Sequence, residues 1–208
     1  VLGLQVSFAQ IGALGPAPFG ALLVVMAATV LAGLAGARLA GQSRYSGMLA
    51  GGATAICGAS AALALYGVIG KDRLSQAQFA LSLVGIAMAS AFAMTVYPVL
   101  ARELALSDAQ AGFLIGASIH DVAQAIGGGY AFSDTAGASA TIVKLARVAL
   151  LAPLVALASL WLGSGDSAQP VWKRLVLPWF IVAFLAVVTH NSLVALPSQL
   201  TGIALTAS

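Results

Sequence analysis

The stretch GASIHDVAQAIGGG, residues 116–129, places a histidine, an aspartate and a glutamine in largely apolar text: His120, Asp121 and Gln124. An ionised carboxylate near the centre of a membrane helix costs roughly 2.5 to 3.5 kcal/mol on insertion scales. Ionisable residues in that position usually line a substrate pathway or relay protons, and histidine titrates near physiological pH. We therefore predict that His120 and Asp121 bind or relay a coupling proton. The alternative is a buried polar cluster that only joins neighbouring helices.

Helical spacing indicates how such a site is built. Residues at every fourth position are small or polar and would share one face of a continuous helix: Gly112, Gly116, His120, Gln124 and Gly128. Small residues on that face let a neighbouring helix approach closely, so the polar side chains would meet protein rather than lipid. Consecutive glycines weaken a helix, and we predict a helix break at the three that close the stretch: Gly127, Gly128 and Gly129.

A second stretch, GATAICGASA at residues 52–61, shares small residues with GASIHDVAQA at residues 116–125. The match indicates an internal duplication, although chance similarity is the alternative in text this rich in alanine and glycine. Hydroxyls and free amides at a helix break can bind an anion through the positive end of a helix dipole. The substrate-binding candidates from the two stretches are Thr54, Cys57, Gly58, Ser60, Ser118 and Gln124. For residues 52–61, close helix packing is the competing explanation.

Two cations, Lys144 and Arg147, lie three positions apart in the apolar stretch TIVKLARV and so share one helical face. If they face inward, they supply positive charge for an anionic substrate. The alternative is that their long side chains reach the membrane interface. Asn191, in the stretch THNS, is a further candidate for contact with substrate, with hydrogen bonding between helices as the other explanation.

Enzyme chemistry finds little support in the sequence. It has no phosphate-loop glycines, zinc-ligand spacing or paired carboxylates. Ser60 with a histidine on another helix would be the only route to an intramembrane serine protease. We expect no enzyme, no bound metal and no cofactor beyond a coupling proton or sodium ion. Cys57 is the single cysteine, so the chain forms no internal disulfide.

The elements that must position these residues are apolar helices. The chain has 208 residues, of which 61% are hydrophobic and 7% charged, and its mean hydropathy is +1.02. Soluble domains carry about 25% charged residues, and one membrane crossing takes about 20 residues. We predict an all-α polytopic membrane protein of about six transmembrane helices: 18–37, 47–70, 77–101, 109–131, 137–163 and 175–197.

The charges bear on partners and orientation. The net charge of +3 is spread over short loops without a basic run, so nucleic acid is not an expected partner. If each apolar run crosses once, one side receives most of the basic residues: Arg38, Arg44, Arg102, Lys173 and Arg174. The positive-inside rule then places that side in the cytoplasm, opposite Lys71 and Arg73.

Four stretches together resemble a known family: TAICGASA, TVYPVL, GASIHDVAQAIGGG and ATIVKLARVALLAPLV, in this order. The chain is similar to the YeiH-type bacterial inner membrane proteins, described as sulfate exporters, from LGLQVSFAQI to PWFIVAFLAVVTHNSL. The resemblance implies a bundle of about ten helices with two inverted repeats, like the bile acid/sodium symporter fold. Residues 1–208 would be a single transmembrane domain truncated at both ends, with 1–74 ending the first repeat and 75–208 forming most of the second.

The same resemblance implies a function. The protein would be a multi-pass secondary transporter of the bacterial inner membrane that exports sulfate, sulfite or an organosulfonate by alternating access. Two broken, crossing helices, carrying residues 54–61 and 118–124, would surround the central site. The chain departs from the family pattern in having Asp121 where we expect glutamate, and in the glycine-rich continuation at 127–129. A channel, a membrane protein that transports nothing, and the protease are the alternatives.

Overall fold

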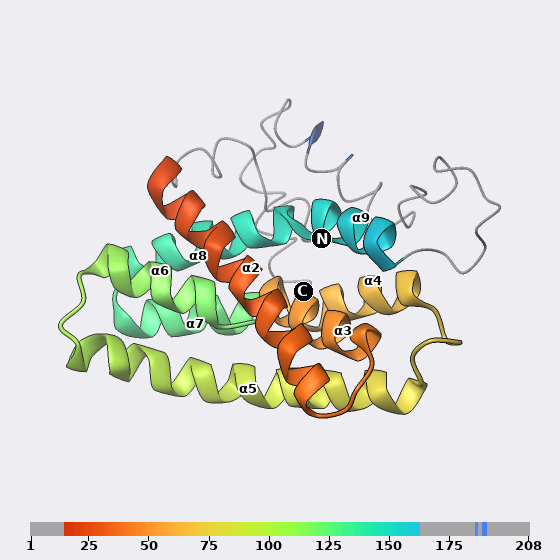
Figure 1. Ribbon diagram of the computed structural model, residues 1–208. Coiled ribbons are helices and arrows are strands. Elements are labelled where there is room, and N and C mark those ends of the chain that lie inside the picture. The colour runs from red at the N-terminus through yellow and green to blue at the C-terminus, as the bar shows by residue number, and fades with distance from the viewer. Residues whose placement is uncertain (1–14, 163–185, 187–188, 191–208) are drawn as a thin grey trace.

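The computed structural model describes residues 15–162, 186, 189 and 190. Its elements are all helices, which confirms the predicted helical class for that part of the chain (Figure 1). In chain order they are α2 (Pro16–Leu39), α3 (Arg44–Ala55), α4 (Ala59–Ile69), α5 (Gln76–Glu103), α6 (Asp108–Ser118), α7 (Val122–Phe132), α8 (Asp134–Ala149) and α9 (Leu151–Leu162). Asn191 and most of the helix predicted over 175–197 lie outside the described residues.

Three stretches in the described part are long and apolar enough to cross a membrane: α2, α5, and α8 together with α9. Large apolar side chains on their outer faces point away from the protein, with Val24 69%, Met88 69% and Phe92 70% exposed. Exposed apolar surface on this scale is unfavourable in water and fits contact with lipid. These long helices frame the rest of the bundle.

Side-chain caps fix where α5 and α6 begin. Ser75 accepts a hydrogen bond from the Gln78 amide at 3.2 Å, while the Gln78 side chain accepts one from the Ser75 amide at 3.0 Å. Ser107 and Gln110 form the same capping box at the start of α6. Each box pairs amides that a helix start leaves without an internal partner. The loops before α5 and α6 therefore end at defined residues.

The first hairpin consists of α3 and α4, which run antiparallel. The chain turns at residues 56–58, where Gly58 adopts φ +68°. A Cβ added to Gly52 in α3 would lie 2.7 Å from Leu65 Cδ1 in α4. Gln78, at the start of α5, donates a hydrogen bond to Gln42 Oε1, just before α3, at 3.2 Å. The hairpin therefore enters and leaves at the same end of the bundle.

The second hairpin consists of α6 and α7 and enters from the opposite end (Figure 1). A Cβ on Gly112 would meet Ser139, and one on Gly116 would meet Ala140, so α6 runs parallel to α8. Gly129 faces Gly137 across the short turn between α7 and α8, so α7 runs antiparallel to α8. It follows that α6 and α7 are antiparallel to each other, with their turn at residues 119–121.

These hairpins correct the predicted helices over 47–70 and 109–131. Both stretches are interrupted, as the resemblance implied, but each turns back instead of crossing once. The predicted break at Gly127, Gly128 and Gly129 is wrong, because all three lie within α7. Gly129 is instead a packing position, where an added Cβ would lie 2.9 Å from Ala140 Cβ. The supposed continuous face from Gly112 to Gly128 is likewise divided by the turn.

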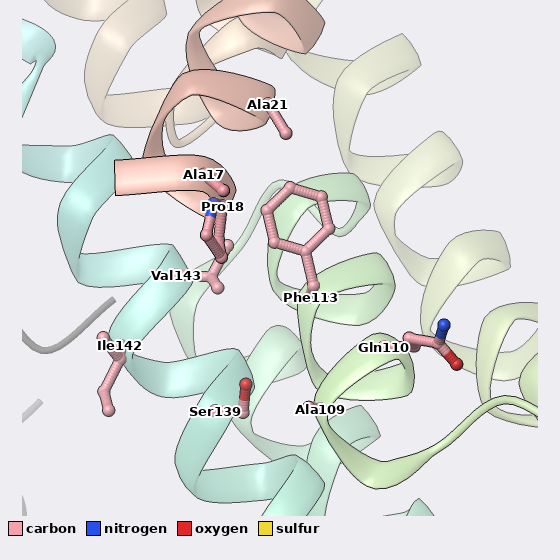
Figure 2. A pocket seen from close by; sticks show the side chains of 9 residues that line it. All are labelled: Ala17, Pro18, Ala21, Ala109, Gln110, Phe113, Ser139, Ile142 and Val143. Carbon is pink, nitrogen blue, oxygen red and sulfur yellow. The ribbon is translucent and has the colours of Figure 1, made fainter. Parts of the chain in front are cut away.

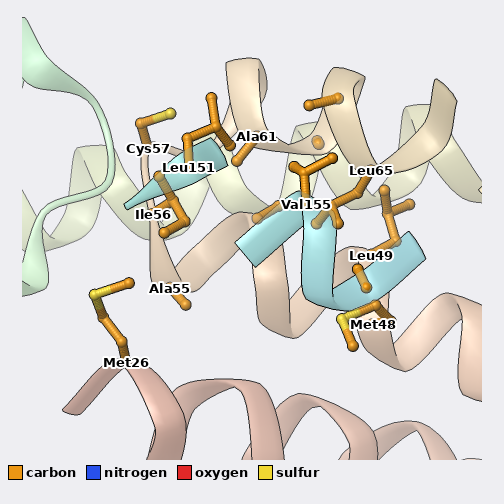
Figure 3. Close-up of a cluster of buried hydrophobic side chains, with 14 of the residues drawn as sticks. Met26, Met48, Leu49, Ala55, Ile56, Cys57, Ala61, Leu65, Leu151 and Val155 are labelled. Atoms are coloured by element: carbon orange, nitrogen blue, oxygen red, sulfur yellow. The ribbon is translucent and has the colours of Figure 1, made fainter. Parts of the chain in front are cut away.

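The main buried cluster lies between the first hairpin, α2 and α9 (Figure 3). It is built from small and branched side chains, including Leu49, Ala61, Leu65 and Val155, each at most 1% exposed. Alanine and glycine at these contacts let the helices approach closely, which is the usual basis of packing between membrane helices. The core therefore holds the tip of the first hairpin in a fixed position beside α9.

Candidate functional site

The tips of the two hairpins meet at the middle of the bundle. A Cβ on Gly58, in the first tip, would lie 3.4 Å from the Cβ of His120 in the second. The Lys144 side chain of α8 joins them: its Nζ donates hydrogen bonds to the Ile56 carbonyl at 3.1 Å and to the Ile119 carbonyl at 2.6 Å. Residues far apart in the sequence are thus brought to one point.

Arg147, one helical turn further along α8, makes a second bridge between the hairpins. On the first hairpin, its Nε and Nη2 donate to the carbonyls of Ala55 and Thr54 at 3.0 and 2.8 Å. On the second, Nη1 donates to the carbonyls of Ala117 at 2.6 Å and Gly116 at 3.4 Å. The planar guanidinium suits this role because its N–H groups point in several fixed directions.

Both cations face inward, so the alternative that they reach the membrane interface is wrong. Lys144 is 0% exposed and Arg147 is 3% exposed. Every hydrogen bond that the structure describes for them ends on a backbone carbonyl. Most of these carbonyls belong to the last turns of α3 and α6, which carry the negative ends of the helix dipoles. Two basic side chains thus face the negative ends of two helix dipoles at this centre.

Ser90 of α5 fastens the second tip. Its Oγ accepts hydrogen bonds from the backbone amides of His120 and Asp121, both at 3.2 Å, and donates one to Gln124 Oε1 at 2.5 Å. Ser90 is only 2% exposed. Ser90 is not among the residues predicted from the sequence, although a hydroxyl near the centre of an apolar helix is a signal for it. Gln124 is thereby held beside the turn.

The predicted proton pair occupies two different environments in that tip. Asp121 is exposed and caps α7, with its Oδ1 accepting a hydrogen bond from the Gln124 amide at 2.9 Å. His120 is half-buried, and its Nδ1 is buried without a hydrogen-bond partner among the residues that the structure describes. The described residues show no bond between the two side chains. The two residues are neighbours in the sequence, but Asp121 binds the start of α7 while His120 lies beside Gly58 of the first tip.

The remaining predicted residues divide between the two hairpins. Thr54 is half-buried and contributes its carbonyl to Arg147, while Cys57 is buried in the first tip. Ser60 is exposed in the first turn of α4, whose N-cap Gly58 provides no side-chain hydrogen bond. Ser118 is half-buried and ends α6. Thr54, Cys57, Ser60 and Ser118 are thus close to the tips in sequence, whereas Asn191 lies outside the described residues.

An apolar cavity of about 630 Å³ lies elsewhere, between the start of α2 and the helices α6 and α8 (Figure 2). Phe113, Ile142 and Pro18 contribute to its wall, and its polar lining residues are Gln110 and Ser139. None of the predicted site residues that the structure describes lines it. Since the described lining has no ionisable side chain, this cavity does not correspond to the basic centre described above.

Apolar helices around a buried, hydrogen-bonded polar centre define an integral membrane protein. The family model described as "Conserved hypothetical protein 698" matches residues 1–208, and the chain belongs to this family. The YeiH-type resemblance is therefore confirmed as a family assignment.

Curated relatives support the same assignment. The UPF0324 membrane protein CT0845 of Chlorobaculum tepidum is 38% identical over 97% of this chain and 56% of its own length. The UPF0324 membrane protein TauZ of Paracoccus denitrificans is 35% identical over 98% of this chain and 61% of its own. The UPF0324 membrane protein RB0971 of Rhizobium meliloti is 39% identical over 92% of this chain and 56% of its own. The chain thus spans less than two thirds of these relatives, and no solved structure matches it.

Proposed function

We propose that the whole protein is a secondary transporter that exports a small anion across the bacterial inner membrane by alternating access. The observation that carries this proposal is the joining of both hairpin tips by Lys144 and Arg147 at the centre of the bundle. Secondary transporters commonly place their substrate at the midplane, where interrupted helices present helix termini to it. Here the interrupted segments enter from opposite ends, so each hairpin can open or close the route to its own side.

The charges favour an anion as substrate. The C-terminal ends of α3 and α6 are already paired with cations, whereas the positive N-terminal end of α4 has no side-chain cap. The exposed Ser60 hydroxyl lies in that first turn. An anion there would accept hydrogen bonds from amides and hydroxyl, while the two buried cations lower its electrostatic energy. Thr54, Cys57, Gly58, Ser118 and Gln124 remain proposed as the surrounding residues, with Asn191 as a further contact.

His120 and Asp121 are proposed as the coupling group. Asp121 is exposed, so it can exchange a proton with water while it caps α7. His120 lies beside the first tip, and its buried Nδ1 is available for a new hydrogen bond. Protonation of either residue would change the charge next to the anion and thereby its affinity. Sodium coupling is the competing form of the same proposal.

The substrate class is tested directly by flux. The TauZ name of the Paracoccus relatives hints at a role related to taurine or another sulfonate, so taurine belongs beside sulfate and sulfite. Full-length protein in liposomes should carry at least one of these labelled anions with saturable kinetics, and an imposed pH gradient should drive the flux. Flux that never saturates would indicate a channel, and absence of flux for all three would refute this choice of substrates.

The protease alternative requires Ser60 to be activated by a histidine. The structure describes no hydrogen bond between Ser60 and His120, and His120 Nδ1 has no partner. A serine nucleophile normally lies within hydrogen-bond reach of its base. Cleavage of a membrane substrate that is lost in Ser60→Ala would nevertheless establish the protease and overturn the transporter.

A further inference from the structure

A small cavity with two arginines in its wall lies at the end of the bundle where α2 ends, α3 begins and α9 ends. It measures about 310 Å³ and is lined by Leu34, Arg38, Gln42, Arg44 and Trp161. We infer that it binds the phosphate group of an anionic phospholipid, with two arginines as ligands. This site is remote from the hairpin tips and does not depend on the proposed transport function.

The aromatic side chains around the cavity hold one of its arginines in place. The Arg44 guanidinium carbon lies 5.1 Å from the centre of the Tyr45 ring and 6.0 Å from that of Trp161. One of its nitrogens donates a hydrogen bond to the Tyr45 hydroxyl at 3.3 Å. Arginine has five N–H donors, so others remain for a ligand. A positioned guanidinium matches the geometry of phosphate oxygens.

Arg38 completes the pair from the last turn of α2. It is exposed, and its side chain makes no hydrogen bond within the described part of the chain. The end of a helix favours a cation, which helps to keep Arg38 beside the cavity. Two guanidinium groups in the wall of one cavity can share a single phosphate.

The charge of this end as a whole favours an anion. Its described loops and helix ends carry four basic residues and one acidic residue: Arg38, Arg44, Lys71, Arg73 and Asp72. The opposite end carries one basic residue and three acidic ones: Arg102, Glu103, Asp108 and Asp134. Basic pockets between membrane helices on one side of the bilayer are typical sites for anionic headgroups.

The surroundings favour a lipid rather than free phosphate. Trp161 is 52% exposed, and tryptophan rings in membrane proteins concentrate at the headgroup level. Leu34 forms an apolar part of the cavity wall, and Leu31, one turn earlier on α2, is 64% exposed. An acyl chain attached to the bound phosphate could follow this apolar helix into the bilayer.

Native mass spectrometry of the full-length protein, released from detergent with added lipids, tests this site. We expect phosphatidylglycerol to remain bound, and phosphatidylcholine and inorganic phosphate not to replace it. Arg38→Gln should weaken phosphatidylglycerol binding roughly tenfold, the effect of losing a charge-assisted hydrogen bond. Arg102→Gln at the opposite end is the matched control and should leave binding unchanged.

The variant Trp161→Leu gives a second measurement, because it removes the ring but no charge. It should also weaken phosphatidylglycerol binding while the protein keeps its elution volume in size-exclusion chromatography. Equal retention of the two phospholipids, equal losses in Arg38→Gln and Arg102→Gln, or competition by inorganic phosphate at lipid concentrations would each overturn the site.

Discussion

Replacing Lys144 with methionine tests whether the buried cation holds the two hairpins together. The change keeps a long apolar side chain but removes hydrogen bonds to the carbonyls of Ile56 and Ile119. Each buried carbonyl left without a partner costs about 1 to 3 kcal/mol. Relief from burying a charge offsets part of that loss. We expect Lys144→Met to lower the free energy of unfolding by about 2 to 4 kcal/mol.

The assay is thermal and denaturant unfolding of the full-length protein in detergent, with Lys71→Met as the matched control. Lys71 is exposed in the loop between α4 and α5, so its loss should change stability by less than about 0.5 kcal/mol. Hydrogen exchange should increase at the tips, residues 56–58 and 119–121, in Lys144→Met alone. If the two variants unfold alike and the tips stay protected from exchange, Lys144 does not hold the two hairpins together.

Three further substitutions test the tips. Ser90→Ala leaves two amides of the second tip unpaired and should lower the free energy of unfolding by about 2 to 3 kcal/mol. Ser82→Ala, which loses only a hydrogen bond to its own helix, should lower it by less. Equal decreases in the two variants would contradict the role of Ser90 in fastening the tip. Gly58→Ala places a Cβ at φ +68° and 3.0 Å from Ile86 Cγ2, so it should lower the free energy of unfolding by about 1 to 2 kcal/mol, seen as a lower melting temperature. In Gly67→Ala the added Cβ meets open space, so this control should not lower the melting temperature. Asp121→Asn keeps a capping side chain and hence the stability of the protein, but it should alter the pH dependence of flux. Asp121→Ala should in addition lower the free energy of unfolding by about 1 kcal/mol. Unchanged pH dependence of flux in both variants would exclude the proton role.

Composition predicted the helical class, and four motifs in order indicated the family. Residue type singled out Lys144 and Arg147, which the structure places between the hairpin tips, while their proposed roles stay predictions. The sequence did not predict the hairpins, since hydropathy measures how long an apolar run is and not whether the chain turns back. Residues 47–70 have the length of one crossing, and the turn depends on Gly58 and on packing of Gly52 against Leu65. Only contacts between distant segments reveal it.

The wrongly predicted helix break at residues 127–129 has a related cause. Three consecutive glycines lower helix propensity, yet α7 continues through residues 127–129 because close packing of Gly128 on the α6 side and of Gly129 on α8 compensates for that loss. The true turn lies earlier, where Asp121 can cap a new helix and Ser90 can pair the free amides. Ser90 contributes from a helix thirty residues away, so a local sequence pattern can mark this hydroxyl as unusual but cannot show which turn it binds.

The hairpins change the side of the membrane on which two loops lie, but the number of crossings between residues 15 and 162 stays odd. Three crossings and five crossings both leave residues 15 and 162 on opposite sides, so a reporter attached at either position cannot distinguish the two arrangements. The loops at 70–75 and 104–107 each lie on opposite sides of the membrane in these two arrangements. Lys71 and Arg73 thereby join Arg38 and Arg44 on one face, and by the positive-inside rule we expect that face, where the first hairpin opens, to be the cytoplasmic one.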